Sequence, residues 1–484
     1  MNKNHTATCH GHPSMTLLIL LGAFLLAHGP GQAQSAARIS DVYVRVSPRD
    51  PRYFELTDGR PYIPIGLNMI APPSSAGWTT MTEWIRKLSD QGGNFIRIWL
   101  SSPYFDIEHQ RSGAFDLDKA ERIDLLLEQA ARNHIRVKMC LEHFRDFNEK
   151  QPAWSSKPLH LISRGGTATN VADFFNGEKS REHFRQKLRW YAEYYGNNPN
   201  VFGWELWNEI NAVQAGDYMA WTDAMLPELK RLFPSNLVMQ SLGSYDTERV
   251  SALYQRLAVM RGNEVAQVHR YLDLGASLKA CQGPVDILAA DAVRTLLASD
   301  PGRPVLLAES GAVEPRHTGP FKLYEKDRAG MILHDVLFAP FFSGAAGPGH
   351  IWHWDHYVSK NNLWHHFGRF AEAVKNIDPA AERFAPFLLT TARLRIYGLR
   401  GQQNLLLWCR DSRNDWQSEL RDGKSPETVS GETLPDSIEL GDLNKARISY
   451  YDPWQNRWSQ TQETSRRIRL PDFQRSLAVR IQVP

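Results

Sequence analysis

The chain has 484 residues, of which 42% are hydrophobic and 23% are charged. This composition is ordinary for a globular protein and excludes an intrinsically disordered chain, and the length is enough for one large domain plus a small one. The formal net charge is +3, or +2 once the single lysine of residues 1–33 is removed, and it does not indicate a nucleic-acid partner.

The N-terminus has the features of a secretory leader. Lys3 precedes an apolar run over residues 16–27, and small residues at 31–33 fit a cleavage site. The run is short for a membrane span, and no other stretch approaches about 18 uninterrupted apolar residues. We therefore predict that residues 1–33 are a signal peptide and that the mature protein is soluble and secreted, periplasmic or extracellular. A signal anchor is the alternative.

The cysteines do not indicate a disulfide framework or a zinc site. Cys9 lies in the predicted leader, ahead of the apolar run, whereas a lipid-bearing cysteine would have to follow that run. Cys140, Cys281 and Cys409 are an odd number, widely spaced and without a CxxC pair, although one bridge stays open. Cys140 lies in an apolar run and is interpreted as a small core residue.

Two short strands at 42–46 and 53–57 follow the leader, and we expect residues 34–60 to form a lid hairpin packed on the next domain. Beyond them, strand-like runs alternate with helical patterns. The predicted strands are 62–67, 94–100, 137–141, 201–207, 237–241, 264–269, 305–309 and 345–352. The predicted helices are 80–91, 118–133, 178–195, 217–232, 247–257, 287–299, 323–338 and 363–377.

Eight strand–helix units predict a (β/α)₈ TIM barrel over residues 61–378. An open, doubly wound sheet is the alternative. The barrel is preferred because no strand is followed by a Gly-rich phosphate-binding turn, and because polar and aromatic residues recur at the strand ends, which a barrel brings to one mouth. Those ends carry Arg97 and Trp99, Glu142 and His143, Asn208 and Glu209, His269 and Tyr271, Glu309, and Trp352 and Trp354.

The C-terminal part has a different pattern. A linker at 378–386 ends the helical periodicity, and alternating runs follow at 394–397, 404–408, 447–451, 467–470 and 477–481. Turn residues separate these runs, so they predict an antiparallel β-sandwich domain over residues 388–484.

Two of the predicted strands end in a glutamate. The apolar and aromatic run 201–207 leads into Asn208 and Glu209, and a second apolar run leads into Glu309. A carboxylate at the end of a buried strand is costly unless that end opens into a site. The alternative for Asn208 and Glu209 is a helix N-cap with an acid in the first turn.

Two carboxyl groups at one barrel mouth suit glycoside hydrolysis. One protonates the leaving oxygen, and the other lies about 5 Å away when configuration is retained. The two groups need different environments, and Arg97 would keep one of them ionised. Arg97 has a second interpretation, an inward salt bridge that stabilises the barrel, and the two roles are compatible.

These residues together resemble the clan A glycoside hydrolases, particularly the family-five cellulase and mannanase group. The resemblance rests on the segment 204–209 (Trp-Glu-Leu-Trp-Asn-Glu), on Arg97, on His-x-Tyr at 269–271, on Glu309 and on Trp352. It covers about residues 60–378, and the tail resembles β-sandwiches that accompany such barrels.

The resemblance implies a retaining mechanism at a β-linkage, with Glu209 as acid/base and Glu309 as nucleophile. It also implies that Asn208 bonds the sugar 2-hydroxyl, that His269 and Tyr271 orient the acid/base and the nucleophile respectively, that Arg97 keeps the nucleophile ionised, and that Trp352 is the sugar platform. His143 matches the family's third-strand histidine loosely, and Trp354 competes with Trp352 for the platform.

Aromatic residues near the predicted mouth favour a carbohydrate substrate, because the CH faces of a sugar pack on indole rings. They are Trp78, Trp99, Trp154, Trp207, Trp352 and Trp354. A metal site among His350, His353, His356, His365 and His366 is not expected, because no ligand-type spacing accompanies them. We expect neither a metal nor another cofactor, and the sequence does not indicate an oligomeric state.

The loops 101–117 and 142–176 flank the mouth. Aromatics spread over several loops favour an endo-glucanase or endo-mannanase with a cleft of several subsites. If the loops wall off one end of the cleft, the enzyme is instead an exo-acting β-glycosidase on oligosaccharides. A non-catalytic carbohydrate-binding barrel is a third interpretation, disfavoured because both glutamates and their supporting residues are present.

Overall fold

The computed structural model describes residues 41–74, 77–143, 160–213, 216–438, 446–461 and 468–482. The predicted signal peptide, residues 1–33, and the predicted mouth residue Trp154 lie outside these ranges. Within them, no helix combines the length and the apolar character that a membrane crossing requires.

A small antiparallel sheet precedes the main fold. It consists of β1 (Val44–Val46), β2 (Phe54–Leu56) and β3 (Pro61–Tyr62), so the predicted hairpin gains a third strand. Phe54 packs edge-on against Phe202 with ring centroids 5.3 Å apart, and the Tyr62 hydroxyl donates to the carbonyl of Asn94. Phe202 and Asn94 lie where their strands begin. The sheet therefore covers the floor of the main fold and not the end that carries the glutamates.

Seven parallel strands form most of the barrel wall. Five are bonded in chain order, β4 (Gly66–Asn68), β5 (Phe95–Trp99), β6 (Arg136–Glu142), β7 (Val201–Trp207) and β8 (Leu237–Met239), and two form a second pair, β9 (Ala266–Asp273) and β10 (Val305–Val313). Every residue of these strands is buried, as expected when side chains fill the inside and helices cover the outside.

Further backbone hydrogen bonds connect these two sheets into a ring. The N–H of Glu264 donates to the carbonyl of Val238 at 3.0 Å, which joins the segment before β9 to β8. The extended segment 345–352 bonds to both of its neighbours: the N–H of His350 donates to Leu307 on β10, and its Ile351 carbonyl accepts from Asn68 on β4. The predicted (β/α)₈ barrel is the fold.

The predicted eighth strand, 345–352, is not a regular strand and has a single bridge, between Ser310 and Ile351. Its sequence explains the irregularity. Pro348 has no N–H to donate, and Gly349 passes so close to Val336 that a Cβ would lie 2.5 Å from the Val336 carbonyl oxygen.

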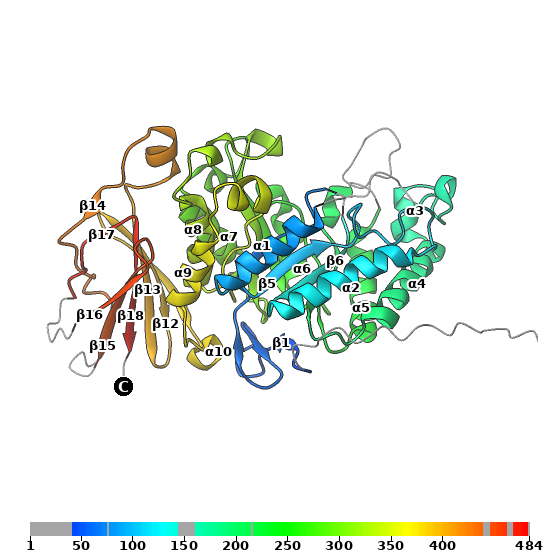
Figure 1. The fold of residues 1–484 in the computed structure, drawn as a ribbon, viewed down its shortest axis with the longest axis horizontal. Helices are drawn as coiled ribbons and strands as arrows, with labels where there is room; N and C mark the ends of the chain where they lie inside the picture. The colour runs from blue at the N-terminus through cyan, green and yellow to red at the C-terminus, as the bar shows by residue number, and fades with distance from the viewer. Residues whose placement is uncertain are drawn as a thin grey trace, which may run out of the picture. The chain divides into compact units, whose positions relative to one another are not determined.

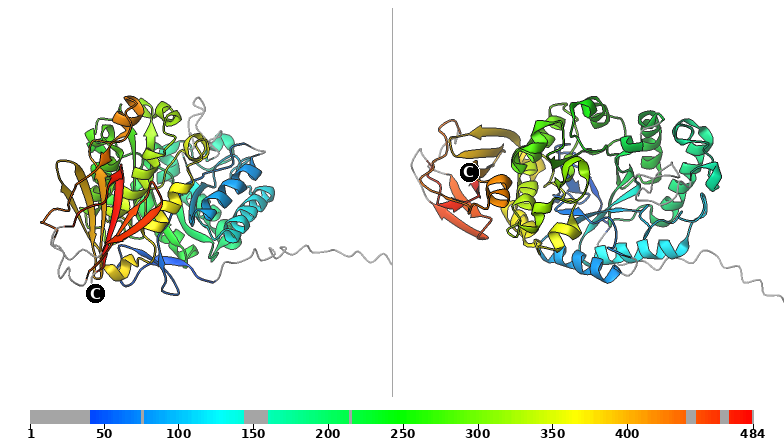
Figure 2. Two further views of the ribbon diagram at one scale, coloured as in Figure 1. Left: turned by 60° about the vertical axis from the view of Figure 1, so that its left-hand side comes forward. Right: turned by 90° about the horizontal axis from the view of Figure 1, so that it is seen from above.

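In the described part of the chain, helices that follow the strands cover them on the outside (Figures 1 and 2). They are α1 (Trp78–Asp90), α2 (Leu117–Arg132), α4 (Glu178–Tyr195), α5 (Tyr218–Leu232), α6 (Ser251–Ala258), α7 (Val285–Leu297), α8 (Met331–Phe342) and α9 (His365–Ala373). α8 begins later than the predicted residue 323. Gly330 is left-handed, and the Asp327 carboxylate accepts from the N–H groups of Met331 and Ile332, which sets the start of the helix.

The C-terminal part forms a six-stranded antiparallel sheet. Its order is β11 (Ala385–Thr390), β12 (Leu394–Arg400), β13 (Asn404–Asp411), β18 (Ser476–Gln482), β15 (Arg447–Asp452) and β16 (Arg457–Thr461), and a two-stranded sheet, β14 (Thr428–Val429) with β17 (Phe473–Gln474), lies on one face. β11 begins at the end of the predicted linker, 378–386, and continues to Thr390, where no strand was predicted. It is a largely exposed edge strand that contains Pro386, so it lacks the alternating apolar signal.

The two faces of the large sheet belong to two different cores. On β13, Leu405 and Leu407 pack with residues of the small sheet, whereas Leu406 and Trp408 join the core of the barrel. α8 is buried on all sides at this contact, and its Asp335 accepts two hydrogen bonds from Arg410, at 2.9 and 3.1 Å. The three described cysteines, Cys140, Cys281 and Cys409, are free and buried, so the bridge left open by the sequence is not formed.

Candidate active site

The end of β7 delivers Asn208 and Glu209 to the barrel mouth. Glu209 has a φ of +51°, a left-handed conformation that is uncommon for a residue other than glycine. Its N–H donates to the Ser241 hydroxyl at 3.1 Å, which holds this turn. The Asn208 side-chain oxygen accepts from Arg97 at 2.6 Å. Asn208 is therefore not the helix N-cap that the sequence left open.

Glu309 reaches the same mouth from β10. The pairing of β10 with β9 shifts register between Leu307 and Glu309, so one extra residue is inserted and Glu309 lies opposite His269. A bulge of this kind changes the direction in which the following side chain points. The sequence pattern did not show it.

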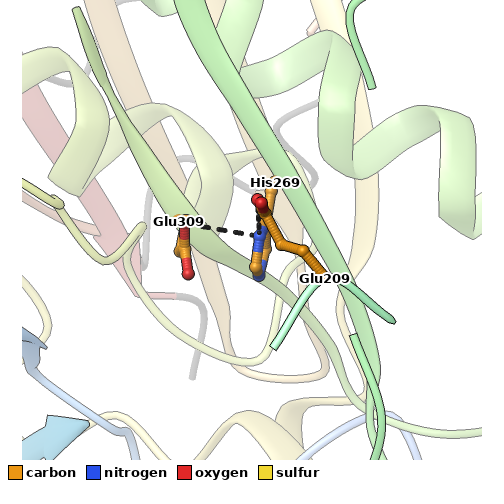
Figure 3. Close-up of side chains that lie close together, drawn as sticks. All are labelled: Glu209, His269 and Glu309. Carbon is orange, nitrogen blue, oxygen red and sulfur yellow. Dashed lines mark hydrogen bonds and ion pairs between the residues drawn. The ribbon is translucent and has the colours of Figure 1, made fainter. Parts of the chain in front are cut away.

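His269 lies between the two glutamates (Figure 3). Its Nδ1 is 2.8 Å from Glu209 Oε1 and 3.4 Å from Glu309 Oε2, and one oxygen of each carboxyl group and this nitrogen all lie within 4.8 Å of one another. Burial, together with the charges of Arg97 and Lys138, lowers the pKa of His269 well below its usual value, so the ring is neutral. His269 Nε2 has no hydrogen-bond partner, which indicates that Nδ1 carries the proton.

Glu309 has two further donors. The Tyr271 hydroxyl donates to Oε2 at 2.8 Å, and Arg97 Nη1 donates to Oε1. Tyr271 lies two residues after His269 on β9, so both side chains point to the same face of the strand. The two glutamates thus have different partners: Glu209 contacts a neutral imidazole, and Glu309 contacts a cation and a phenol.

Arg97 also forms the inward salt bridge that was its second interpretation. Its Nε donates to Glu205 Oε2 at 2.8 Å, and Lys138 Nζ lies 3.1 Å from the same oxygen. Burial opposes ionisation of Glu205, but these two cations outweigh it and lower its pKa. Glu205 was not among the predicted site residues, although a charge in the middle of an apolar strand signals a buried partner.

Burial raises the pKa of both mouth glutamates, but to different extents. For Glu209 the charge of Glu309 adds to the effect of burial, and its pKa is raised well above the usual value. For Glu309 the charge and hydrogen bond of Arg97 and the hydrogen bond of Tyr271 oppose burial, so the rise is smaller. Glu209 is therefore the group that keeps a proton while Glu309 ionises.

A cavity of about 630 Å³ opens over the two glutamates. Three tryptophans predicted for the mouth line it, Trp99, Trp352 and Trp354, and so do Asn208 and Tyr271. Other residues that line it were not identified from the sequence, and they include Asn211, Gly243, Asp246, Val250, His317 and His353. These come from the loops after the strands, where single residues have no distinctive pattern.

Several predicted mouth residues do not line this cavity: Trp78, Arg97, Glu142, His143, Trp207 and His269. His143 is buried behind Trp99, with ring centroids 4.4 Å apart, and its Nδ1 lies 2.6 Å from the Ser101 hydroxyl. Trp207, the last residue of β7, is fully buried and packs against the helix residues Phe175 and Trp221. Trp78 stacks on Tyr104, with ring centroids 6.2 Å apart.

Within the described ranges, the five histidines between residues 350 and 366 do not form a group of metal ligands. His350 bonds to the Pro64 carbonyl, His366 to the Ala329 carbonyl and His353 to the Tyr324 hydroxyl. Glu209, His269 and Glu309 are close enough to share a metal ion. However, Arg97 already supplies a positive charge to Glu309, and the unequal pKa values of the two glutamates suit acid–base chemistry.

Comparison with known proteins shows which family this site belongs to. A family model described as cellulase (glycosyl hydrolase family 5) matches residues 59–334. The fold is similar to a glycoside hydrolase of known structure, with 12% identity over 91% of this chain and 97% of the other and a TM-score of 0.59. It is also similar to a family 5 glycoside hydrolase from Bacteroides vulgatus, with 13% identity over 91% and 93% of the two chains and a TM-score of 0.56.

A family 5 mannosidase from Rhizomucor miehei shares 16% identity over 65% of this chain and 86% of its own, with a TM-score of 0.50. At such identities the likeness concerns the fold alone. No curated protein matches this chain in sequence. The family model covers more than half of the chain and agrees with the resemblance seen in its motifs, so the chain belongs to glycosyl hydrolase family 5 and is a glycoside hydrolase.

Proposed function

We propose that this chain is a retaining β-glycoside hydrolase in which Glu309 is the nucleophile and Glu209 the acid/base. The observation that supports retention is the spacing of the pair, with an oxygen of each carboxyl group within 4.8 Å. Retaining enzymes hold their two carboxyl groups about 5–5.5 Å apart, whereas inverting enzymes leave about 6.5–9.5 Å for a water molecule.

In the first step Glu309 attacks the anomeric carbon. Arg97 and Tyr271 stabilise its ionised form, and Glu209 donates its proton to the leaving glycosidic oxygen as that bond breaks. The product is a glycosyl ester on Glu309, and the released alcohol carries the proton from Glu209.

In the second step Glu209 changes from acid to base. Once Glu309 is an ester it has no charge, so the repulsion that helped to raise the pKa of Glu209 is gone. The pKa of Glu209 therefore falls, and its carboxylate can take a proton from the water that hydrolyses the ester. His269 stays neutral and donates through Nδ1 to Glu209 during this change.

Asn208 and one of the two predicted platform tryptophans bind the sugar. Asn208 turns its carbonyl oxygen to Arg97, so its amide N–H₂ group is left to donate to a substrate hydroxyl in the cavity. Trp352 is the better platform because it is only partly buried, whereas Trp354 is 7% exposed and packs edge-on against it at 5.6 Å. We assign His143 a supporting role behind Trp99.

Azide rescue tests the two assignments separately. We expect Glu209→Ala and Glu309→Ala each to lower turnover by orders of magnitude with the fold retained. With azide, the Glu209 variant should form a β-glycosyl azide from the covalent intermediate, and the Glu309 variant an α-glycosyl azide. Glu314→Ala is the matched control, because Glu314 lies just beyond β10 and bonds to Lys322 outside the cavity. Full activity of either cavity variant would refute the assignment.

We propose endo action on a β-glucan or a β-mannan. The support is the breadth of the cavity, which takes residues from several strand ends and, at about 630 Å³, lies within the range of roughly 300–1,000 Å³ for pockets that bury drug-sized ligands. Exo action is the second candidate. The ring centroids of Trp99 and Trp352 are 5.1 Å apart, so the two rings together form a wall on one side of the cavity. Early release of only mono- or disaccharide from a soluble polysaccharide, with unchanged viscosity, would favour exo action.

We also propose that the protein is exported and that its signal peptide ends at residue 33. The support is the N-terminal pattern alone. Sequencing the N-terminus of the mature protein tests it, and a mature chain that retains Met1 would contradict it.

A further inference from the structure

Asp246, Asp273 and His317 come together beside the glutamate pair from three separate parts of the barrel. Asp273 is the last residue of β9, on the same face of the strand as His269 and Tyr271. Asp246 follows β8, and His317 ends the short 3₁₀ helix η5 (Pro315–His317) after β10. One ligand atom of each residue lies within 4.8 Å of the others.

Asp273 is held with one oxygen directed into this group. Its Oδ1 accepts from the backbone N–H groups of Gly275, at 2.7 Å, and Arg316, at 3.0 Å, which fixes the carboxylate. Its Oδ2 has no hydrogen-bond partner although the side chain is 1% exposed, and His317 Nε2 is 3.7 Å away, too far for a hydrogen bond. Buried carboxylate oxygens are normally bonded, so this oxygen indicates a missing ligand.

The charges of the group favour a cation. No lysine or arginine in the described ranges forms an ion pair with Asp246 or Asp273. The His317 side chain adds a ring nitrogen, the side-chain atom that most often binds metals in proteins, beside the two carboxylates. The ligand atoms of the two carboxylates and the imidazole all lie within 4.8 Å of one another, so they can offer three donors to one cation.

We propose that Asp246, Asp273 and His317 bind a divalent cation of the Zn²⁺ or Mn²⁺ type. One imidazole with two carboxylates suits these ions, and three protein ligands leave positions open for water or substrate. Ca²⁺ fits less well because it takes six to eight oxygen ligands. The two backbone donors to Asp273 Oδ1 supply the outer contacts that orient a metal-binding carboxylate.

The proposed cation would lie at the edge of the cavity. Asp246 and His317 line it, so an ion held between them lies at its edge, where it can bind substrate hydroxyl oxygens. The His317 ring packs edge-on against Tyr271 at 5.1 Å, and Tyr271 donates to Glu309. The ion therefore ties together the loops after β8, β9 and β10 on one side of the glutamate pair.

Manganese titration of the full chain tests this site. After treatment with EDTA, Mn²⁺ is added and the unbound ion is measured by electron paramagnetic resonance. We expect one equivalent to bind, with affinity at least ten-fold weaker in Asp273→Asn and in His317→Ala. Asp355→Asn is the matched control: Asp355 also lines the cavity beside a histidine, His356, and loses the same charge, but it lies outside the trio.

A second variant separates the two possible locations of the ion. Glu309→Gln removes a carboxylate from the catalytic cluster and should leave Mn²⁺ binding unchanged. The proposal is overturned if binding does not saturate, if Asp273→Asn and His317→Ala bind as tightly as the natural chain, or if Glu309→Gln is the variant that loses the ion. Binding is measured without substrate, so the result does not depend on the proposed glycosidase mechanism.

Discussion

Replacing Tyr271 by Phe should raise the apparent pKa of the nucleophile. The substitution keeps the ring and removes the hydroxyl that donates to Glu309 Oε2 at 2.8 Å in a fully buried setting. A hydrogen bond to a charged group contributes about 1.5–3 kcal/mol. Since one pKa unit corresponds to about 1.4 kcal/mol, the loss should raise the apparent pKa of Glu309 by about 1 to 2.

The pH profile of kcat/KM measures this change. Glu309 attacks only when ionised, so the acidic limb of the profile reports its pKa in the free enzyme, and the basic limb reports the proton held by Glu209. A donor to the carboxylate favours the ionised form, so its removal raises the pKa and moves the acidic limb to higher pH. Activity at acidic pH should fall steeply, whereas activity near the basic limb should change much less.

Tyr324→Phe is the control for this experiment. Tyr324 is also buried, and its hydroxyl accepts from the Ala312 N–H and lies 3.2 Å from His353 Nδ1, without contact to either glutamate. Its acidic limb should match that of the natural chain. If Tyr271→Phe leaves the acidic limb in place, or moves it to lower pH, the inference that this hydroxyl stabilises ionised Glu309 is wrong.

Two other substitutions test the supports of the site. Arg97→Met leaves Glu205 and Glu309 buried without their shared cation. Chemical denaturation should show a loss of about 3–5 kcal/mol in the free energy of unfolding. An unchanged free energy of unfolding would contradict the salt-bridge role. Trp352→Ala should lower kcat/KM by roughly 10- to 100-fold, the equivalent of about 1–3 kcal/mol, mainly through KM, whereas Trp352→Phe should keep most of the activity because it keeps a ring. Equal losses in both Trp352 variants would argue against a platform.

The order of strands and helices could be read from the sequence because it depends on local patterns. Apolar runs such as 201–207 alternate with amphipathic helices, and a parallel strand buried on both faces is recognised by its own residues. The missed or misplaced elements are those whose own residues lack such a pattern. β11 is an exposed edge strand, 345–352 is interrupted by Pro348, and the start of α8 depends on a cap from Asp327.

Which two glutamates form the pair at the barrel mouth could also be inferred from the sequence. An apolar run that leads into a carboxylate points to the carboxyl end of a strand, and in a barrel these ends meet at one mouth. Glu209 lies just after β7, whereas β10 continues past Glu309 to Val313. Glu209 and Glu309 therefore follow from the positions of β7 and β10 along the chain. The same reasoning brings Arg97, His269 and Tyr271 to that mouth.

Only the tertiary structure decided which of these side chains touch. The left-handed turn at Glu209 and the bulge before Glu309 set the distance between their carboxyl groups, and neither has a sequence signal here. Asp246 and His317 come from the segments after β8 and β10, and Asp273 from the end of β9, so no spacing along the chain relates them. The spacing of apolar residues and the composition describe one segment of the chain at a time. A site depends on distances between segments, and the packing of the whole barrel sets those distances.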